Sequence, residues 1–291
     1  VFYEIDDLIF DATLFPEPIE SYGGQISQDQ YDGLVRGTVL FQEAMRLCDL
    51  AIASTTPLLT QMEKIVGSGN CYLHRNALDS HNSDALAVTT PKVARSYLSI
   101  FYGSGTKAHN SDFDELVAPA LAKILQEHEN VRLTLMGYLT IPEILAPYEE
   151  KIDRVDIVKD IAVYYEFLKQ ADISIAVLHP TIVNNCKSEL KWFESASFKI
   201  PSVVSNTEVY LEVVEHGKDG LIASNPEEWY DCLNLLVQDE RLRRDIGNNA
   251  HKRVMHQYSV AAMSKNSLNS IESGVNKLSD SGDIVPRPQR K

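Results

Sequence analysis

Short apolar runs alternate with longer amphipathic segments along most of the chain. Apolar residues that recur every three or four positions indicate helices, whereas short β-branched runs bounded by glycine or polar residues indicate strands. From residue 98 onward the alternation is regular, and it predicts a doubly wound parallel sheet. The predicted strands are residues 98–102, 131–136, 155–158, 173–178, 202–205 and 220–223. The predicted helices are residues 112–128, 163–170, 188–198, 207–216, 226–238 and 239–257.

The first 80 residues follow the same pattern less completely. Strands are predicted at 1–5, 50–53 and 71–73, and helices at 29–48 and 58–66. Two or three parallel strands leave open edges, so this segment is interpreted as the back half of an α/β domain. The chain begins with Val rather than Met and opens directly in a strand-like run. We therefore expect the start of this domain to be missing from the sequence.

These segments give the expected domain organisation. Residues 79–96 are polar and contain Pro91, which is typical of a linker, and the polar residues after 278 are predicted to be disordered. The expected parts are the C-terminal part of an N-terminal α/β domain (1–85), a linker (86–96), a Rossmann-like domain (97–260), a C-terminal helix (261–278) and a disordered tail (279–291).

Composition narrows the class of protein. Of the 291 residues, 44% are hydrophobic and 23% charged, which is typical of a globular protein. The net charge of -14 argues against a general nucleic-acid binder, although a few local cations still suffice for a small anionic ligand. No apolar run of membrane-spanning length and no signal peptide are present, so we expect a cytoplasmic protein. The four cysteines form no CxxC pair, which predicts reduced thiols and no metal site.

A glycine-rich segment follows the first strand of the regular part and precedes a helix. It consists of Gly103, Ser104, Gly105, Thr106 and Lys107. In such a turn the backbone N–H groups can approach a phosphate, and the helix N-terminus adds a favourable potential. The segment has neither the GxGxxG nor the Walker pattern, so it predicts neither a standard dinucleotide site nor a P-loop. A plain connecting turn is the alternative.

A second candidate lies on the predicted helix 188–198 and just before it. On a helix, Lys187, Lys191 and Glu194 would share one face because they follow i, i+4, i+7 spacing. At the carboxyl edge of a parallel sheet the two cations would suit a diphosphate, and the carboxylate would suit two ribose hydroxyls. A solvated stripe of Lys and Glu is the alternative.

Acidic and histidine side chains supply further candidates. Asp6 and Asp7 end the first strand, but adjacent strand residues point to opposite faces, so a shared metal ion is not expected. A carboxylate facing a cleft, or a helix cap, fits them better. His109 follows the glycine segment and could reach a phosphate or a sugar hydroxyl, whereas His74 and His179 end strands. Exposed loop residues are the alternative for all three, and no Ser-His-Asp arrangement is recognisable.

Taken together, these segments resemble the group 1 family of retaining glycosyltransferases, which have the GT-B fold. Residues 187–205 (KSELKWFESASFKIPSVVS) are similar to the family's second-glutamate helix and the strand after it, and this implies that Glu194 binds the donor ribose. The family motif has another Glu eight residues earlier, where this chain has Cys186. A subgroup from surface-polysaccharide clusters carries a Lys-Ser pair there, which makes Lys187 and Ser188 the candidate replacements.

Other segments resemble the same family. Residues 101–113 are similar to the subgroup's glycine loop that faces the donor phosphates, and residues 1–7 are similar to a strand that often ends in His-Asp, with Asp6 in the place of the cleft histidine. Further similar segments are residues 54–55, 76–79 and 164–175. The resemblance covers residues 1 to about 258, and it implies that residues 1–85 belong to the acceptor-side domain and 97–260 to the donor-binding domain.

The resemblance implies a transferase of polysaccharide biosynthesis. It would move a sugar from a nucleotide-diphosphate donor to a glycan or lipid-linked acceptor, with retention and without a metal ion or other cofactor. Asp6, His109 and Lys191 are the expected catalytic residues, and the amides of 103–106 with Lys107 and Lys187 would help to hold the diphosphate. The missing part of the acceptor-side domain would carry acceptor recognition and any peripheral contact with the inner face of the membrane.

Three other functions are weighed against this one. A catalytically idle module that binds nucleotide sugars is favoured by the Cys186 departure. An enzyme similar to UDP-sugar 2-epimerases would use the same donor pocket without an acceptor. A Rossmann oxidoreductase is disfavoured because its glycine motif and ribose-binding acid are not found. The sequence does not specify the base, the sugar, the acceptor or the oligomeric state.

Overall fold

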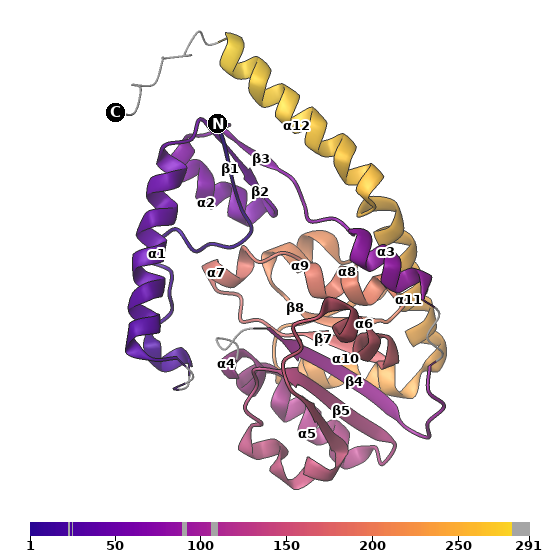
Figure 1. The fold of residues 1–291 in the computed structure, drawn as a ribbon. Helices are drawn as coiled ribbons and strands as arrows, with labels where there is room; N and C mark the ends of the chain where they lie inside the picture. The colour runs from indigo at the N-terminus through magenta and orange to yellow at the C-terminus, as the bar shows by residue number, and fades with distance from the viewer. Residues whose placement is uncertain (23, 25, 89–91, 106–109, 281–291) are drawn as a thin grey trace.

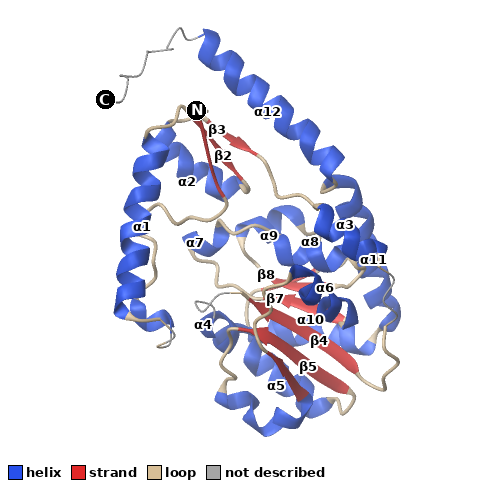
Figure 2. Ribbon diagram, viewed as in Figure 1, coloured by secondary structure: helices blue, strands red, loops and turns tan. Residues whose placement is uncertain are grey.

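The computed structural model describes residues 1–22, 24, 26–88, 92–105 and 110–280. Within this part of the chain, two β-sheets are surrounded by helices (Figure 1, Figure 2). One sheet has the strand order β6-β5-β4-β7-β8-β9 and the other the order β1-β2-β3. All neighbouring strands in both sheets are parallel. The predicted α/β class is therefore confirmed.

The larger sheet follows the regular part of the sequence. Its strands are β4 (Leu98–Ser104), β5 (Val131–Gly137), β6 (Ile152–Val155), β7 (Ile173–Ala176), β8 (Ser202–Ser205) and β9 (Leu221–Ala223). Helices α5 (Ala118–Glu127) and α10 (Pro226–Gln238) pack on one face. The other face is covered by α6 (Ile161–Gln170), α8 (Leu190–Ser197), α9 (Glu208–Val213) and α11 (Glu240–Gln257). Helices on both faces make this sheet doubly wound.

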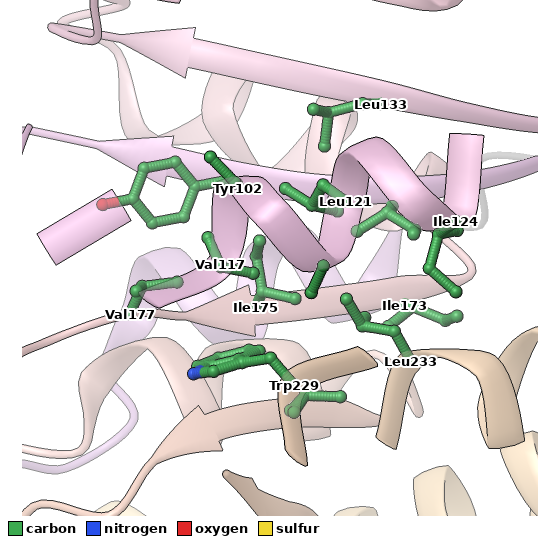
Figure 3. Close-up of a cluster of buried hydrophobic side chains, with 14 of the residues drawn as sticks. Tyr102, Val117, Leu121, Ile124, Leu133, Ile173, Ile175, Val177, Trp229 and Leu233 are labelled. Carbon is green, nitrogen blue, oxygen red and sulfur yellow. The ribbon is translucent and has the colours of Figure 1, made fainter. Parts of the chain in front are cut away.

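The alternation of side chains along β4 explains how the two layers form. Ile100 and Tyr102 belong to the buried cluster with α5 and α10, whereas Phe101 belongs to the cluster with α6. Successive strand residues point to opposite faces, so an uninterrupted apolar run is what a strand covered on both sides needs. Figure 3 shows Tyr102 of β4, Leu121 of α5 and, below them, Trp229 of α10. Trp229 is fully buried.

The smaller sheet is built from the first 73 residues. Its strands are β1 (Phe2–Ile5), β2 (Leu50–Ala53) and β3 (Cys71–Leu73), with helices α1 (Gln28–Arg46) and α2 (Thr56–Val66) beside them. The cluster of buried side chains between these elements also contains Cys186, with Val183 packed against it, and both come from the other sheet's part of the chain. The two sheets are therefore joined by shared apolar packing.

The last helix returns to the smaller sheet. Helix α12 (Val260–Asp280) runs from the end of α11 back past β3 (Figure 1). Gly274 approaches this sheet so closely that an added Cβ would lie 2.7 Å from Leu50 Cδ1. Near the end of the helix, Lys277 donates to the Gly69 carbonyl and to Asn70 Oδ1, both at 2.8 Å. Both ends of the described chain thus lie at the three-stranded sheet.

Several predicted helices differ from the observed ones. The expected linker contains helix α3 (Ser80–Ala87), because Asp79 and Asn82 form a reciprocal capping box that starts a helix in a polar stretch. The predicted helix 112–128 is divided into α4 (Asn110–Asp112), a π-helical turn (Phe113–Val117) and α5. A short helix, α7 (Ile182–Asn185), precedes α8. Helix α12 continues through Asp280, two residues into the expected tail, and residues 281–291 lie outside the described part.

Two strands also differ. Strand β4 continues through Ser104, so the first two residues of the predicted glycine turn belong to the strand and pair with the end of β5. Strand β6 lies at 152–155 rather than 155–158, because its pairing with β5 runs from Ile152 to Val155. The expected bounds of the domains stay a prediction. All four cysteines are free, and no described helix has the length and apolar character of a membrane span.

Candidate functional site

A cavity of about 300 Å³ lies at the carboxyl ends of β4 and β5. In doubly wound sheets this is the edge where ligands bind. Its walls come from the ends of the two strands, the segment after β6, the start of α6 and the first turns of α8. The lining residues are Gly103, Ser104, Gly105, Met136, Gly137, Ile157, Val158, Lys159, Ile161, Tyr164, Leu190, Lys191 and Glu194. A larger hollow of about 1020 Å³ lies at the opposite edge of the sheet and contains none of the predicted site residues.

Two glycines, Gly103 and Gly137, line this cavity at the ends of β4 and β5. Gly137 ends β5 with φ +96°, a conformation that L-residues rarely adopt, and an added Cβ would lie 2.0 Å from the Ser104 carbonyl oxygen. At Gly103 an added Cβ would lie 3.2 Å from the ring of Tyr164. Glycine at position 137 therefore lets the end of β5 approach Ser104 closely. Gly103, Ser104 and Gly105 line the cavity, and their contact with a phosphate stays a prediction.

Lys191 is the less exposed of the two lysines that line the cavity, since Lys159 is exposed. Its ammonium donates to the Gly103 carbonyl and lies 4.7 Å from the centroid of the Tyr102 ring. Burial lowers the pKa of Lys191 to about 8, although the carboxylate of Glu194 opposes this. A charge that has lost much of its hydration interacts more strongly with an anion than a solvated one does.

Glu194 lies one helical turn further along α8. Its Oε2 accepts from the Tyr164 hydroxyl at 3.2 Å, and its Oε1 lies 3.5 Å from the Tyr165 hydroxyl. Burial raises the pKa of Glu194 to about 7, against the hydroxyl of Tyr164 and the ammonium of Lys191, which lower it. The carboxylate keeps lone pairs that no described protein group uses, and two neighbouring hydroxyls of a ligand could donate to them.

Together, the groups that line the cavity are suited to bind a ligand with a particular set of chemical groups. A partly buried ammonium beside the ends of two strands suits an anionic group such as a diphosphate. A partly buried carboxylate one helical turn further along α8 suits a diol, and the apolar side chains of Ile157 and Val158 supply a wall for a flat ring. The arrangement can therefore hold a molecule that has these three parts.

The prediction that Lys187, Lys191 and Glu194 share one helix face is wrong for Lys187, which lies before the helix. Helix α8 begins at Leu190, and the preceding residues turn out of the helix, so Lys187 does not line the cavity. Its ammonium lies 3.5 Å from Asp7 Oδ1 instead. Ser188 is in the same turn and does not line the cavity either.

Three predicted site residues, Thr106, Lys107 and His109, lie outside the described part of the chain. Asp6 is separate from the cavity. It accepts from Asn76 Nδ2 at 3.1 and 3.3 Å and lines a smaller cavity of about 140 Å³ together with His74. That cavity lies at the carboxyl ends of the three-stranded sheet. His179 lies 3.2 Å from Glu115 Oε2.

Asp6 and Asp7 do not converge on one point, since Asp7 pairs with Lys187 and Asp6 with Asn76. Within the described ranges, no group of three or more His, Cys, Asp or Glu residues is arranged to hold a metal ion. Cys186 does not face the cavity. Its thiol is buried among the side chains of the smaller sheet, and its carbonyl accepts from the Thr55 hydroxyl at 2.9 Å.

Sequence reasoning missed several residues of the site. Tyr164 and Tyr165 were noticed only as part of a helix, and Ile157 and Val158 were assigned to a strand that in fact ends at Val155. Glu189 was also missed. Its carboxylate is buried and accepts from the Tyr258 hydroxyl at 2.5 Å and from Arg75 at 3.1 Å. A sequence signal existed for Glu189, since Trp192 and Phe193 follow it at the i+3 and i+4 positions of the predicted helix, and a carboxylate on such an apolar face requires a buried partner.

Comparison with known proteins agrees with this description. Residues 115–269 match a family model described as glycosyl transferase-like. Glycosyltransferase 1 domain-containing protein 1 of Xenopus tropicalis is 23% identical over 150 residues, which cover 49% of this chain and 41% of that protein. The chain thus spans less than half the length of this curated relative.

Many solved structures have a similar fold, among them those of TarM, HepE and WaaG. A mutant of TarM from S. aureus, in complex with fondaparinux, α-GlcNAc-glycerol and UDP, matches with a TM-score of 0.65 and 12% identity over 92% of this chain and 50% of its own. Anabaena HepE in complex with UDP-glucose has a TM-score of 0.62 and 16% identity over 94% and 72%. WaaG, which is involved in lipopolysaccharide biosynthesis, has a TM-score of 0.55 and 12% identity over 91% and 73%. These likenesses confirm the predicted GT-B fold class.

Proposed function

The chain belongs to the glycosyl transferase-like family, and we propose that it binds a nucleotide-diphosphate sugar and transfers the sugar to a glycan or lipid-linked acceptor with retention. The observation that carries this proposal is the pairing of Lys191 and Glu194 in one cavity beside the bare strand ends of β4 and β5. The ammonium would meet the diphosphate, and the carboxylate would accept from the two ribose hydroxyls.

The chemistry depends on stabilising the departing diphosphate. The bond between the anomeric carbon and the diphosphate oxygen breaks, and the oxygen of an acceptor hydroxyl bonds to the anomeric carbon on the same face of the sugar. The hydroxyl proton passes to the departing diphosphate. Negative charge grows on the departing oxygen, where Lys191 and the backbone amides of residues 103–105 would stabilise it. No metal ion is needed in this scheme. Asp6, at the ends of the other sheet, would face the acceptor side, and the roles of Lys107 and His109 stay predictions.

The relatives suggest which donor to try first. The TarM complex contains UDP and the HepE complex contains UDP-glucose. WaaG belongs to lipopolysaccharide biosynthesis, which supports a role in making a surface polysaccharide. A lipid-linked acceptor would place the protein at the inner face of a membrane.

The proposal is tested by turnover of sugar nucleotides. The chain is incubated with UDP-glucose, UDP-GlcNAc and GDP-mannose, while released nucleoside diphosphate is quantified and the anomeric configuration of the released sugar is followed by proton NMR. We expect slow release of one diphosphate with retention, and a loss of about 100-fold in the Lys191→Ala variant. The control is Lys218→Ala, which removes an exposed cation far from the cavity. Inversion, or equal rates in both variants, would contradict the proposal.

A catalytically idle binding module is the second candidate. The observation in its favour is Cys186, which is buried in the core of the smaller sheet and does not reach the cavity. Binding of a sugar nucleotide without release of diphosphate, in the presence of water and simple glycosides, would favour this module. Conversion of one UDP-sugar into its 2-epimer without an acceptor would indicate an epimerase instead.

A further inference from the structure

A line of three polar side chains connects helix α3 with Glu194. Asn82 Nδ2 donates to the Tyr165 hydroxyl at 2.5 Å, and the Tyr165 hydroxyl lies 3.5 Å from Glu194 Oε1. Helix α3 precedes β4 in the chain and lies beside α6 and α8 (Figure 1). Neither Asn82 nor Tyr165 lines the cavity.

The backbone N–H of Asp79 determines which group donates in each of these hydrogen bonds. The backbone N–H of Asp79 can only donate, and it donates to Asn82 Oδ1 at 2.9 Å. The amide oxygen of Asn82 is therefore occupied, and its NH₂ group is the part that faces Tyr165. Because the NH₂ group can only donate, the Tyr165 oxygen must accept from it. The proton of the Tyr165 hydroxyl is then directed away from Asn82 and towards Glu194.

Packing holds both members of the line in place. Asn82 is 4% exposed and Tyr165 is 3% exposed. The ring of Tyr165 packs against Phe198 and Tyr164, with centroid distances of 5.4 and 5.6 Å. The second contact, at 3.5 Å, is longer than a usual O–H···O bond. Hydrogen bonds of a binding site are commonly long in the ligand-free state and shorten when the ligand is bound.

We propose that Asn82 is a positioning residue for Glu194, because it directs the hydroxyl proton of Tyr165 onto this carboxylate. Tyr165 and Tyr164 then donate to different oxygens of Glu194 and leave the remaining lone pairs for the ribose of a nucleotide. The ribose part of this inference rests on the proposed function. The orientation of Tyr165 does not, since it is a property of the free chain.

The charged and titratable groups around Glu194 determine what a change at Asn82 would do. They are Tyr164 and Tyr165 of α6, Lys191 of α8, Asp79 before α3 and Tyr210 of α9. Burial raises the pKa of Glu194 to about 7, and hydroxyl donation from α6 lowers it. If the Tyr165 hydroxyl no longer donated to Glu194, the pKa of Glu194 would therefore rise further.

The test replaces the hydrogen-bond donor at position 82 by an acceptor. In Asn82→Asp the side chain keeps its size and can still accept from the Asp79 N–H, but it can no longer donate to Tyr165. The Tyr165 hydroxyl would turn to donate to the new carboxylate. The titration of Glu194 is followed in the ligand-free full chain by ¹³C NMR of labelled carboxyl groups, and Glu194→Gln assigns its signal. We expect a higher pKa of Glu194 in Asn82→Asp and also in Tyr165→Phe, which keeps the ring packing.

Two controls separate this effect from added charge. Ser83→Asp introduces the same charge at the next, exposed position of α3, and we expect a much smaller change of the Glu194 titration. In a Tyr165→Phe background, Asn82→Asp should lose most of its effect. An unchanged Glu194 titration in both Asn82→Asp and Tyr165→Phe, or an equal effect of Asn82→Asp with and without the Tyr165 hydroxyl, would overturn the proposal.

Nucleotide binding supplies the second readout. UDP, GDP and dTDP are titrated into the same variants at pH 7.5. For the nucleotide that binds, we expect affinity to fall roughly tenfold in Asn82→Asp and to change little in Ser83→Asp. If no nucleotide binds while the Glu194 titration moves as expected, the proposed function fails and the positioning role of Asn82 stands. An unchanged affinity in Asn82→Asp would overturn its role in ligand binding.

Discussion

Lys191 and Glu194 are the pair on which the site depends. Burial brings their pKa values close together, to about 8 for the ammonium and about 7 for the carboxyl group. Each has lost hydration that a ligand could replace, and they are one turn apart on α8. Ionisable groups of opposite charge with strongly shifted pKa values in one cavity are characteristic of functional sites.

The two pKa values predict how binding depends on pH. Glu194 is raised above its ordinary value of 4.5, so it becomes a carboxylate only as the pH rises through about 7. Lys191 is lowered from 10.5, so it begins to lose its charge as the pH rises through about 8. UDP affinity measured by calorimetry between pH 5.5 and 9.5 should therefore be highest between these values and fall on both sides. Glu194→Gln should remove the acid limb, and a flat profile would contradict the assignment.

At single positions, the sequence predicted the pair on α8 but not its neighbours. Helical spacing placed Lys191 and Glu194 on one face, and both line the cavity. The same spacing failed for Lys187, because no periodicity reveals that the chain turns before Leu190. The contacts of Tyr165 with Asn82 could not be predicted either, since they join residues 83 positions apart.

Among the elements, long periodic segments were predicted well and short ones were not. The bounds of α10 and α11 agree with prediction within a residue. Helix α3 was missed because it has little apolar periodicity and is defined by its cap. Strand β6 was displaced because the apolar residues from Ile152 to Val158 allow several registers, and only the pairing with β5 selects one.

The junction of β4 and β5 should be the most sensitive element of the site. In Gly137→Ala the new Cβ would meet the Ser104 carbonyl at 2.0 Å, and the backbone conformation is also unfavourable for alanine. We expect a loss of about 3 kcal/mol in the free energy of unfolding, together with loss of UDP binding. Urea denaturation and calorimetry measure these two effects.

The control for this change is Gly217→Ala. Gly217 has a similar φ of +80°, but an added Cβ would meet nothing within 4 Å. It should therefore show only the conformational cost, about 1 kcal/mol, and keep its affinity for UDP. Equal effects of the two substitutions would mean that the strand ends are not held together by the close approach at Gly137.

At the scale of the whole molecule, Arg75 joins the two sheets. It follows β3 and contacts Glu189 at 3.1 Å and Glu212 at 2.5 Å, both in the larger sheet's part. Beside it, the Leu78 N–H donates to the Tyr258 carbonyl at 2.8 Å. Together with the packing of α12 on the smaller sheet, these contacts hold the two sheets, and the cavities at their carboxyl ends, in a fixed relative position.

Removal of Arg75 should therefore destabilise the protein. Arg75→Met would leave the buried carboxylate of Glu189 without its cation, and we expect a loss of about 3 kcal/mol in urea denaturation at pH 7.5. The control is Lys218→Met, because Lys218 and its partner Glu215 are both exposed. Its effect should stay below about 1 kcal/mol. Similar losses in the two variants would show that Arg75 does not join the sheets energetically.

Binding of a nucleotide diphosphate in the cavity with Lys191 and Glu194 can be measured directly. We would titrate the chain with UDP by calorimetry at pH 7.5, beside Glu194→Gln, Lys191→Ala and the exposed control Glu150→Gln. We expect micromolar binding, roughly tenfold weaker or worse in the first two variants and unchanged in the third. Failure to bind UDP, GDP or dTDP by the folded chain, or binding that both site variants leave unchanged, would contradict this assignment of the cavity.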